Sequence, residues 1–228
     1  MTQLITLIQQ AVIFGTVIMF GCIGEIITEK AGNLNLGVPG IMYLGGIFGL
    51  IGAFYYEKSV PNPNGFISLL LSFVCAFAAS ALGGLIYSFL TITLRANQNV
   101  TGLTLTIFGS GIANFYGGYL NKLAGGVGQI SVATTSAAYR KTLPLATSTG
   151  SFGKIVFSYG FLVYLAILLA IALQYYFNRT RSGLALRAVG ESPATADAAG
   201  ISVTLYKYLA TCIGAGISGL GGLYYVMD

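Results

Sequence analysis

Six long apolar runs constrain this chain more than any other feature. They are 19 to 29 residues long and contain one charged residue, Glu25. The runs are Leu4–Ile27, Val38–Tyr56, Phe66–Leu94, Val100–Leu120, Ile155–Asn178 and Tyr208–Met227. A bilayer core about 30 Å thick is crossed by about 20 apolar residues in a helix, so each run is long enough to span it. The sequence therefore predicts an all-α, polytopic transmembrane helical bundle with about six spanning helices.

The composition excludes the other broad classes. Only 7% of the 228 residues are charged, against about 25% in a soluble domain, so a soluble fold could not cover its surface. The apolar runs show no period-2 alternation, which argues against an outer-membrane barrel. The chain has no His and no CxxC sequence, so a His- or Cys-based metal site and a serine or cysteine triad are not expected.

The positive charges indicate an orientation. Arg179, Arg181 and Arg187 follow the fifth run closely, and such clusters mark cytoplasmic loops. Counting back from this loop places the N-terminus and the loop 121–154 outside. Six Lys/Arg then lie inside and five outside, which is a small excess. The third run exceeds the length that a bilayer requires, so we expect it to tilt or to bend near Gly83-Gly84.

The first connection, from Gly24 to Gly40, is unusual for a short loop. Gly32, Gly37, Pro39 and Gly40 interrupt the helical pattern close to Glu25, Glu29, Asn33 and Asn35. Interrupted helices beside ionisable residues form substrate sites in transporters, where non-helical backbone lines a cavity. The simpler interpretation is a surface turn between two hairpin helices, with Asn side chains that cap the neighbouring helix. Spacing alone slightly favours the turn.

The loop after the fifth run contains a second candidate element. Ser192 is a suitable N-cap, Pro193 suits the first helical position and Gly200 suits the position after the helix. These residues predict a short helix, Pro193–Ala199, with a small and Ala-rich surface. It could dock into a groove on another protein or lie on the lipid headgroups, and the sequence favours neither strongly.

The spacing of the glycines indicates close packing between helices rather than a nucleotide-binding site. The pattern G-x-G-x-x-G at Gly214–Gly219 lies inside an apolar run and follows no strand, so it is not a dinucleotide site. The pairs Ala215–Gly219, Ser218–Gly222 and Gly45–Gly49 are typical of closely packed membrane helices. No Walker sequence is present, so we do not expect this chain to bind or hydrolyse ATP.

Three blocks together resemble the membrane permease subunits of ATP-binding-cassette (ABC) importers, most closely the simple-sugar and nucleoside branch. They are Glu25–Gly40, Arg95–Leu103 and Thr180–Pro193 with its continuation to Gly200-Ile201. The resemblance covers essentially the whole chain. The family continues for several more helices, so residues 1–228 are expected to be one permease domain that lacks the C-terminal helices.

The resemblance implies roles for individual residues. It places the ATPase-coupling helix at Pro193–Ala199 and the substrate passage at the interrupted segment. The coupling residues would be Arg181, Gly183, Arg187, Gly190, Glu191, Pro193, Ala196 and Gly200. The residues of the passage would be Glu25, Glu29, Asn33, Asn35, Gly37, Pro39, Gly40, Gln98 and Thr101.

The same resemblance implies the partners and the location. They are an ABC ATPase subunit, a second permease subunit (the same or a related chain), an extracytoplasmic substrate-binding protein and the lipid bilayer of the cell (inner) membrane. Nucleic acid is not expected as a partner. The chain would bind no cofactor and would not be an enzyme, because ATP is hydrolysed by a partner subunit. The transported solute would be a nucleoside or a simple sugar.

The alternative is a self-contained secondary transporter or channel for a small polar solute. Such a protein usually carries ionisable residues along its pathway within the helices. Here only Glu25 lies inside a run and Glu29 lies just outside it, so a proton or ion relay has few groups to use. Copurification with an ATPase would distinguish the two classes.

Overall fold

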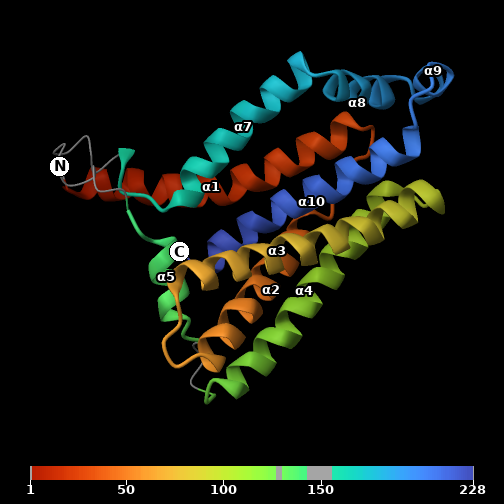
Figure 1. Ribbon diagram of the computed structural model, residues 1–228. Coiled ribbons are helices and arrows are strands. Elements are labelled where there is room, and N and C mark those ends of the chain that lie inside the picture. The colour runs from red at the N-terminus through yellow and green to blue at the C-terminus, as the bar shows by residue number, and fades with distance from the viewer. Residues whose placement is uncertain (1, 127–129, 143–155, 228) are drawn as a thin grey trace.

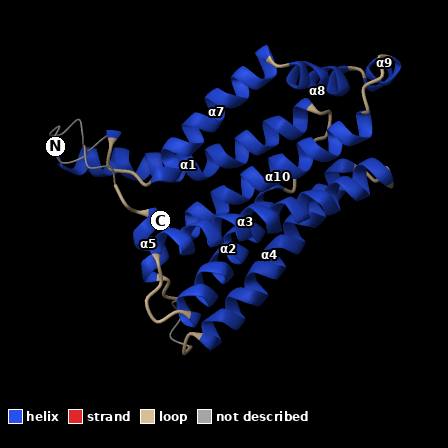
Figure 2. Cartoon of the chain, viewed as in Figure 1, coloured by secondary structure: helices blue, strands red, loops and turns tan. Residues whose placement is uncertain are grey.

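A computed structural model describes residues 2–126, 130–142 and 156–227, and these residues form helices joined by turns, with no strand among them (Figure 2). The long helices are α1 (Thr2–Lys30), α2 (Val38–Ser59), α3 (Gly65–Ser88), α4 (Gln98–Leu123), α7 (Phe161–Arg179) and α10 (Val203–Met227). The shorter elements are a π-helical turn η1 (Phe89–Thr93), α5 (Ala133–Tyr139), α8 (Arg181–Glu191) and α9 (Pro193–Ala198). The predicted helical bundle is confirmed.

Five of the described helices are long and apolar enough to cross a membrane: Gln3–Lys30, Val38–Ser59, Gly65–Thr93, Phe161–Arg179 and Val203–Met227. The sixth expected span lies on α4, which has 26 residues and so sufficient length. Its apolar character is lower because Thr, Ser, Asn and Gly residues recur along it. α4 is therefore the most polar of the long helices.

The helices alternate in direction between two ends of the bundle (Figure 1). α1, α3 with η1, and α7 finish at the end where α8 and α9 lie, and α4 and α10 begin there. We call this the α8–α9 end. α2, α4 and α10 finish towards the opposite end, beside α5, which we call the α5 end. This arrangement brings the Arg-rich segment after α7 to the same end as Lys30 and Arg95.

α10 forms the centre of the bundle and contacts α1, α2 and α3 extensively. Glycines allow this close approach: a Cβ at Gly45 would collide with the backbone of Gly219, and one at Gly222 would collide with the backbone of Met42. A Cβ at Gly49 would meet the side chain of Leu223. The predicted role of the small residues at four-residue spacing is confirmed, and Gly214–Gly219 lies on a packed helix rather than after a strand.

Three local expectations differ from the structure. The third run is not interrupted at Gly83-Gly84, where α3 continues and Gly84 packs closely against Ala215. It instead changes to the wider π-helical turn at Phe89–Thr93. α7 begins at Phe161, later than the apolar run suggested, and residues 181–191, treated as a loop, form the helix α8.

Polar side chains attach α5 to the ends of three long helices. The Glu57 carboxylate of α2 accepts hydrogen bonds from the Thr135 amide (2.7 Å) and hydroxyl (2.5 Å). The Tyr139 hydroxyl donates to the carbonyl of Leu69 on α3 (3.0 Å), and Ser136 donates to that of Met227 on α10 (2.8 Å). Burial raises the pKa of Tyr139 to about 12.

Candidate functional site

The interrupted segment, residues 31–37, separates α1 from α2 by a sharp change of backbone direction. Gly32 has a φ of +80°, a conformation that L residues with a side chain adopt at a cost. The Asn33 amide donates back to the Thr28 carbonyl (3.2 Å), which closes the end of α1. α2 then begins at Val38 with Pro39 in its first turn, where a missing N–H is tolerated.

Side chains from α1 and α10 bond to this segment. The backbone amide of Asn35 donates to Glu25 Oε1 on α1 (2.8 Å), and the side-chain Nδ2 of Asn33 donates to Thr211 Oγ1 on α10 (3.1 Å). Asn33 and Asn35 are 1% and 4% exposed. The Glu25 contact satisfies a backbone amide that has left the helix inside the bundle.

α3 and α4 supply the remaining contacts. The Tyr87 hydroxyl donates to the Leu34 carbonyl (2.5 Å), while the Leu34 amide donates to Gln98 Oε1 (2.8 Å). Thr106 donates to the Leu36 carbonyl (3.1 Å). Four helices thus converge on the segment through side-chain hydrogen bonds to its residues.

The segment lies well inside the α8–α9 end. Thr211, the partner of Asn33, is eight residues after the start of α10 at Val203, which is about 12 Å along the helix. The interpretation as a solvated surface turn is therefore wrong for residues 33 and 35. It is right for Glu29 and Lys30, which are exposed at the end of α1.

The nine residues assigned to the passage divide into three groups. Glu25, Asn33, Asn35 and Gln98 belong to the hydrogen-bonded segment. Gly37, Gly40 and Thr101 lie where the start of α2 touches α4; a Cβ at Gly37 would sit 2.9 Å from the Gly102 carbonyl, and one at Gly40 would sit 2.5 Å from Thr106 Cα. Pro39 lines a cavity, and Glu29 has an exposed side chain while its carbonyl accepts a hydrogen bond from the Gly32 amide (2.8 Å).

Asn35 has a local role as well as a buried position. Its Oδ1 accepts a hydrogen bond from the Gly37 amide (2.9 Å) and so holds the turn that precedes α2. The N-cap of α2 is Gly37, and no side chain makes a cap hydrogen bond there, so the cap interpretation that the sequence left open does not hold for this end of α2.

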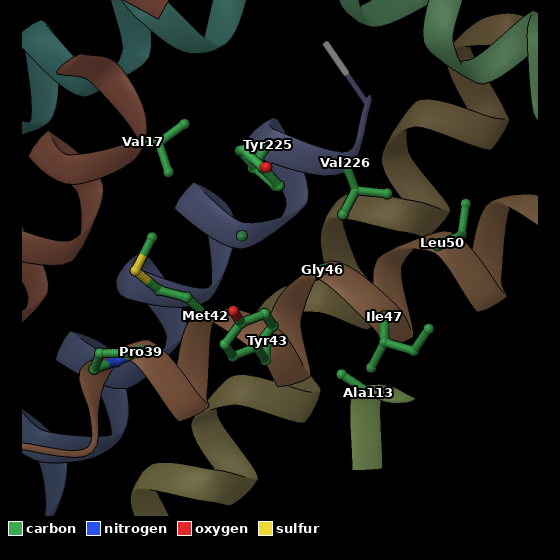
Figure 3. Close-up of a pocket in the computed structure, with 11 residues that line it drawn as sticks. Val17, Pro39, Met42, Tyr43, Gly46, Ile47, Leu50, Ala113, Tyr225 and Val226 are labelled. Atoms are coloured by element: carbon green, nitrogen blue, oxygen red, sulfur yellow. The ribbon is translucent and has the colours of Figure 1, made fainter. Parts of the chain in front are cut away.

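A cavity of about 390 Å³ begins beside Pro39 and follows one face of α2 (Figure 3). Its α2 residues recur at helical spacing along that face, and α1, α4 and α10 contribute the other walls. The lining residues are Val17, Pro39, Met42, Tyr43, Gly46, Ile47, Leu50, Ala113, Gly222, Tyr225 and Val226. The walls are mostly apolar, with the hydroxyls of Tyr43 and Tyr225 as their polar side-chain groups.

The eight residues assigned to coupling lie on α8, on α9 and at their ends. Gly183 packs against the backbone of Tyr176 and Phe177, which makes the turn from α7 into α8 tight. Arg181 and Glu191 are exposed, and Arg187 forms a 4.0 Å ion pair with Glu191. Pro193 begins α9, which ends one residue earlier than expected, and Gly200 follows it with a φ of +81°.

Ala196 differs from the other residues of α9. It is 3% exposed and faces the protein itself, whereas Ala194, Thr195, Ala198 and Ala199 are exposed. A partner that binds α9 would therefore meet these exposed residues, and Ala196 fixes α9 to the rest of the chain.

Gly190 joins the coupling residues to the interrupted segment. A Cβ at Gly190 would collide with the Lys30 carbonyl and would sit 3.1 Å from the Gly32 amide. A Cβ at Gly32 would in turn sit 3.2 Å from Gly190 Cα. The two backbones touch with no side chain between them, so the two sets of residues meet directly.

Sequence reasoning missed Tyr87, Thr106 and Thr211. They bond to residues 53, 70 and 178 positions away in the chain. They lie on α3, α4 and α10, none of which adjoins the segment in the chain, so no local pattern singled them out.

Comparison with known proteins decides the family. Residues 7–228 match the protein family described as the branched-chain amino acid transport system / permease component. The chain belongs to this family. With its apolar spans, this permease-family chain is a multi-pass inner-membrane protein.

Individual relatives carry transport names. The chain is 32% identical over 219 residues to a protein of Haloferax volcanii named as a glucose ABC transporter permease, covering 96% of this chain and 61% of that protein. It is 29% identical to a nucleoside ABC transporter permease of Lactococcus lactis, covering 96% and 66%, and to a guanosine ABC transporter permease of Bacillus subtilis, covering 98% and 68%.

The chain thus spans about two thirds of the length of these relatives. No solved structure matches it significantly.

Proposed function

We propose that this chain is a membrane permease subunit of an ABC importer. It contributes part of the translocation pathway for a nucleoside or a simple sugar and couples it to a separate ATPase. The relatives named for glucose, nucleoside and guanosine transport support this substrate range. In this proposal the chain has no ATPase site of its own and binds no cofactor, because the ATP is bound and hydrolysed by the partner subunit.

The observation that carries the proposal is the backbone contact between Gly190 and Lys30–Gly32. α8 and α9 extend from α7 at one end of the bundle (Figure 1). α9 and the residue after it offer an exposed, Ala-rich surface. When an ATPase moves that surface, α8 presses on the interrupted segment without an intervening side chain that could yield. Because four helices bond to the segment, the displacement reaches each of them.

The passage in this proposal follows α2. The interrupted segment fixes where α2 begins, and the cavity of Figure 3 continues from Pro39 along the helix. Movement of the segment would therefore change the walls of the cavity, as alternating access requires. A second permease subunit and an extracytoplasmic binding protein complete the importer.

Uptake into membrane vesicles tests this function. The chain is expressed with its ATPase and binding protein, and uptake of labelled nucleosides and sugars is measured with ATP or with an imposed ion gradient. We expect uptake to require ATP and to be lost in the variant Ala198→Arg, which places a charged side chain at an exposed position of α9. Ala137→Arg, at an exposed position of α5, is the matched control and should transport normally. Uptake driven by the ion gradient without ATP would contradict the proposal and support a secondary transporter.

A further inference from the structure

The cavity beside α2 has the size of a small-molecule binding site. Its volume of about 390 Å³ lies within the range of small-molecule sites, which is roughly 300–1,000 Å³. Tyr43 and Tyr225 are 55% and 66% exposed, so the cavity is open on the side where their rings lie.

Two aromatic rings from different helices line this cavity. Tyr43 projects from α2 and Tyr225 from α10, with Met42 and Gly46 between the two helices (Figure 3). Neither tyrosine hydroxyl has a hydrogen-bond partner among the residues that the structure describes. Other tyrosines of the bundle, such as Tyr87 and Tyr164, do bond to carbonyl groups. The cavity thus offers aromatic faces and two free hydroxyls.

The rest of the lining excludes a strongly polar ligand. Val17, Ile47, Leu50, Ala113 and Val226 contribute only apolar side-chain surface. A free hexose carries five hydroxyls, and most of them would be left without partners against these walls, which is unfavourable. A planar heteroaromatic ring presents apolar faces to the tyrosine rings and needs few hydrogen bonds at its edge.

We infer that Tyr43 and Tyr225 form a binding site for a planar heteroaromatic ring, such as the base of a nucleoside, with the ribose towards the open side. The inference rests on the proposed function, since it identifies the part of the transported solute that this cavity recognises. Stacking on the rings supplies the affinity, and the two hydroxyls bond to polar atoms at the edge of the base. Free hexoses are poor ligands of this site.

Ligand binding to the purified chain in detergent tests the inference without an ATPase. Saturation-transfer NMR is recorded with adenosine, uridine, ribose and glucose as separate ligands. We expect saturation mainly on the base protons of the two nucleosides and little on either sugar. Tyr43→Leu and Tyr225→Leu should each weaken nucleoside binding roughly five-fold or more, the usual loss when a stacking ring is removed.

Two further variants serve as controls for the position and for the aromatic ring of the substituted tyrosines. Tyr175→Leu, on α7 and 66% exposed but outside the cavity, should bind as the wild type does. Tyr43→Phe keeps the ring and should keep the saturation of the base protons, with thermal unfolding showing that each variant is folded. Equal saturation of glucose and the nucleosides, or nucleoside binding unchanged in both Leu variants, would overturn the inference. ATP-driven uptake of glucose alone in the vesicle assay would likewise overturn it while leaving the proposed function standing.

Discussion

The two ends of the bundle are held together by different means. At the α8–α9 end, the backbone of Gly190 rests on the backbone of residues 30–32, and side chains of four helices bond to the segment that follows. At the α5 end, a short helix is attached through a carboxylate and several hydroxyls, chiefly Glu57 with Thr135 and Tyr139 with Leu69.

The difference has a mechanical consequence. Side chains can change rotamer and absorb a small displacement, but two backbones in contact cannot. In the proposed function the α8–α9 end therefore transmits movement, whereas single side-chain changes can release α5 from its neighbours. Substitutions at the two ends should separate these behaviours.

The largest effect is expected for Gly190→Val. The added carbons would overlap the Lys30 carbonyl and crowd the Gly32 amide, so α8 must move away. Overpacking of this kind costs about 3 kcal/mol of unfolding free energy, and coupled uptake should fall by more than about ten-fold. Gly111→Ala, where a Cβ would meet nothing within 4 Å, is the control. Normal uptake by the Gly190 variant would show that the contact does not carry movement.

A smaller and more local effect is expected for Glu57→Ala. It removes the acceptor of two hydrogen bonds from Thr135, and bonds to a charged group contribute about 2 kcal/mol. Hydrogen exchange at residues 133–139 should accelerate while uptake stays measurable. Glu191→Ala, which breaks only an exposed ion pair, should change stability by less than about 1 kcal/mol. Unchanged exchange in α5 would mean that Glu57 does not hold it.

Asn35→Leu should lower stability by about 1 kcal/mol, because it leaves the buried Gly37 amide without its acceptor. Asn35→Ser keeps a side-chain acceptor and should recover much of that loss. Thermal unfolding and uptake measured on the same preparations separate a structural hydrogen bond from a substrate contact. An Asn35 variant with normal stability and impaired uptake would indicate that the Asn35 side chain contacts the substrate.

The smallest effect at neutral pH is expected for Tyr139→Phe, but it depends on pH. Burial raises the pKa of Tyr139 to about 12 from its usual value near 10. The unfolded chain therefore loses this proton first as pH rises, so the wild type should lose stability relative to the variant above pH 10, by on the order of 1–3 kcal/mol. Below pH 9 the difference in stability between the two proteins should no longer change with pH. A difference that stays constant from pH 8 to 11 would contradict burial of the hydroxyl.

The sequence predicted the elements that depend on local pattern. Apolar length indicated the spans, and Pro193 with Gly200 placed α9 to within one residue of its end. α8 was missed because the Arg-rich stretch after the fifth run was interpreted as a cytoplasmic loop. Gly183 and Gly190 lie in this helix where backbones approach each other closely. α5 was missed because seven polar and small residues carry no strong helical signal.

The sequence singled out the Gly-rich segment, which the structure shows as a buried, hydrogen-bonded break between α1 and α2. It did not single out the cavity along α2 or its two tyrosines. Tyr43 and Tyr225 lie on helices that are distant in the chain and carry no shared pattern. Ala196 was assigned to a partner surface because alanine is small, but helix phase turns it inward.

Photo-cross-linking from α9 tests the central claim most directly. A photoreactive amino acid is placed at Ala198, which is exposed on α9, or at Ala137, which is exposed on α5, and cells that produce the importer are irradiated. The proposed function predicts that the probe at position 198 captures an ABC ATPase and that the probe at 137 does not. Capture of the ATPase from position 137 alone, or from neither position while it is present and assembled, would contradict the coupling role of the α8–α9 end.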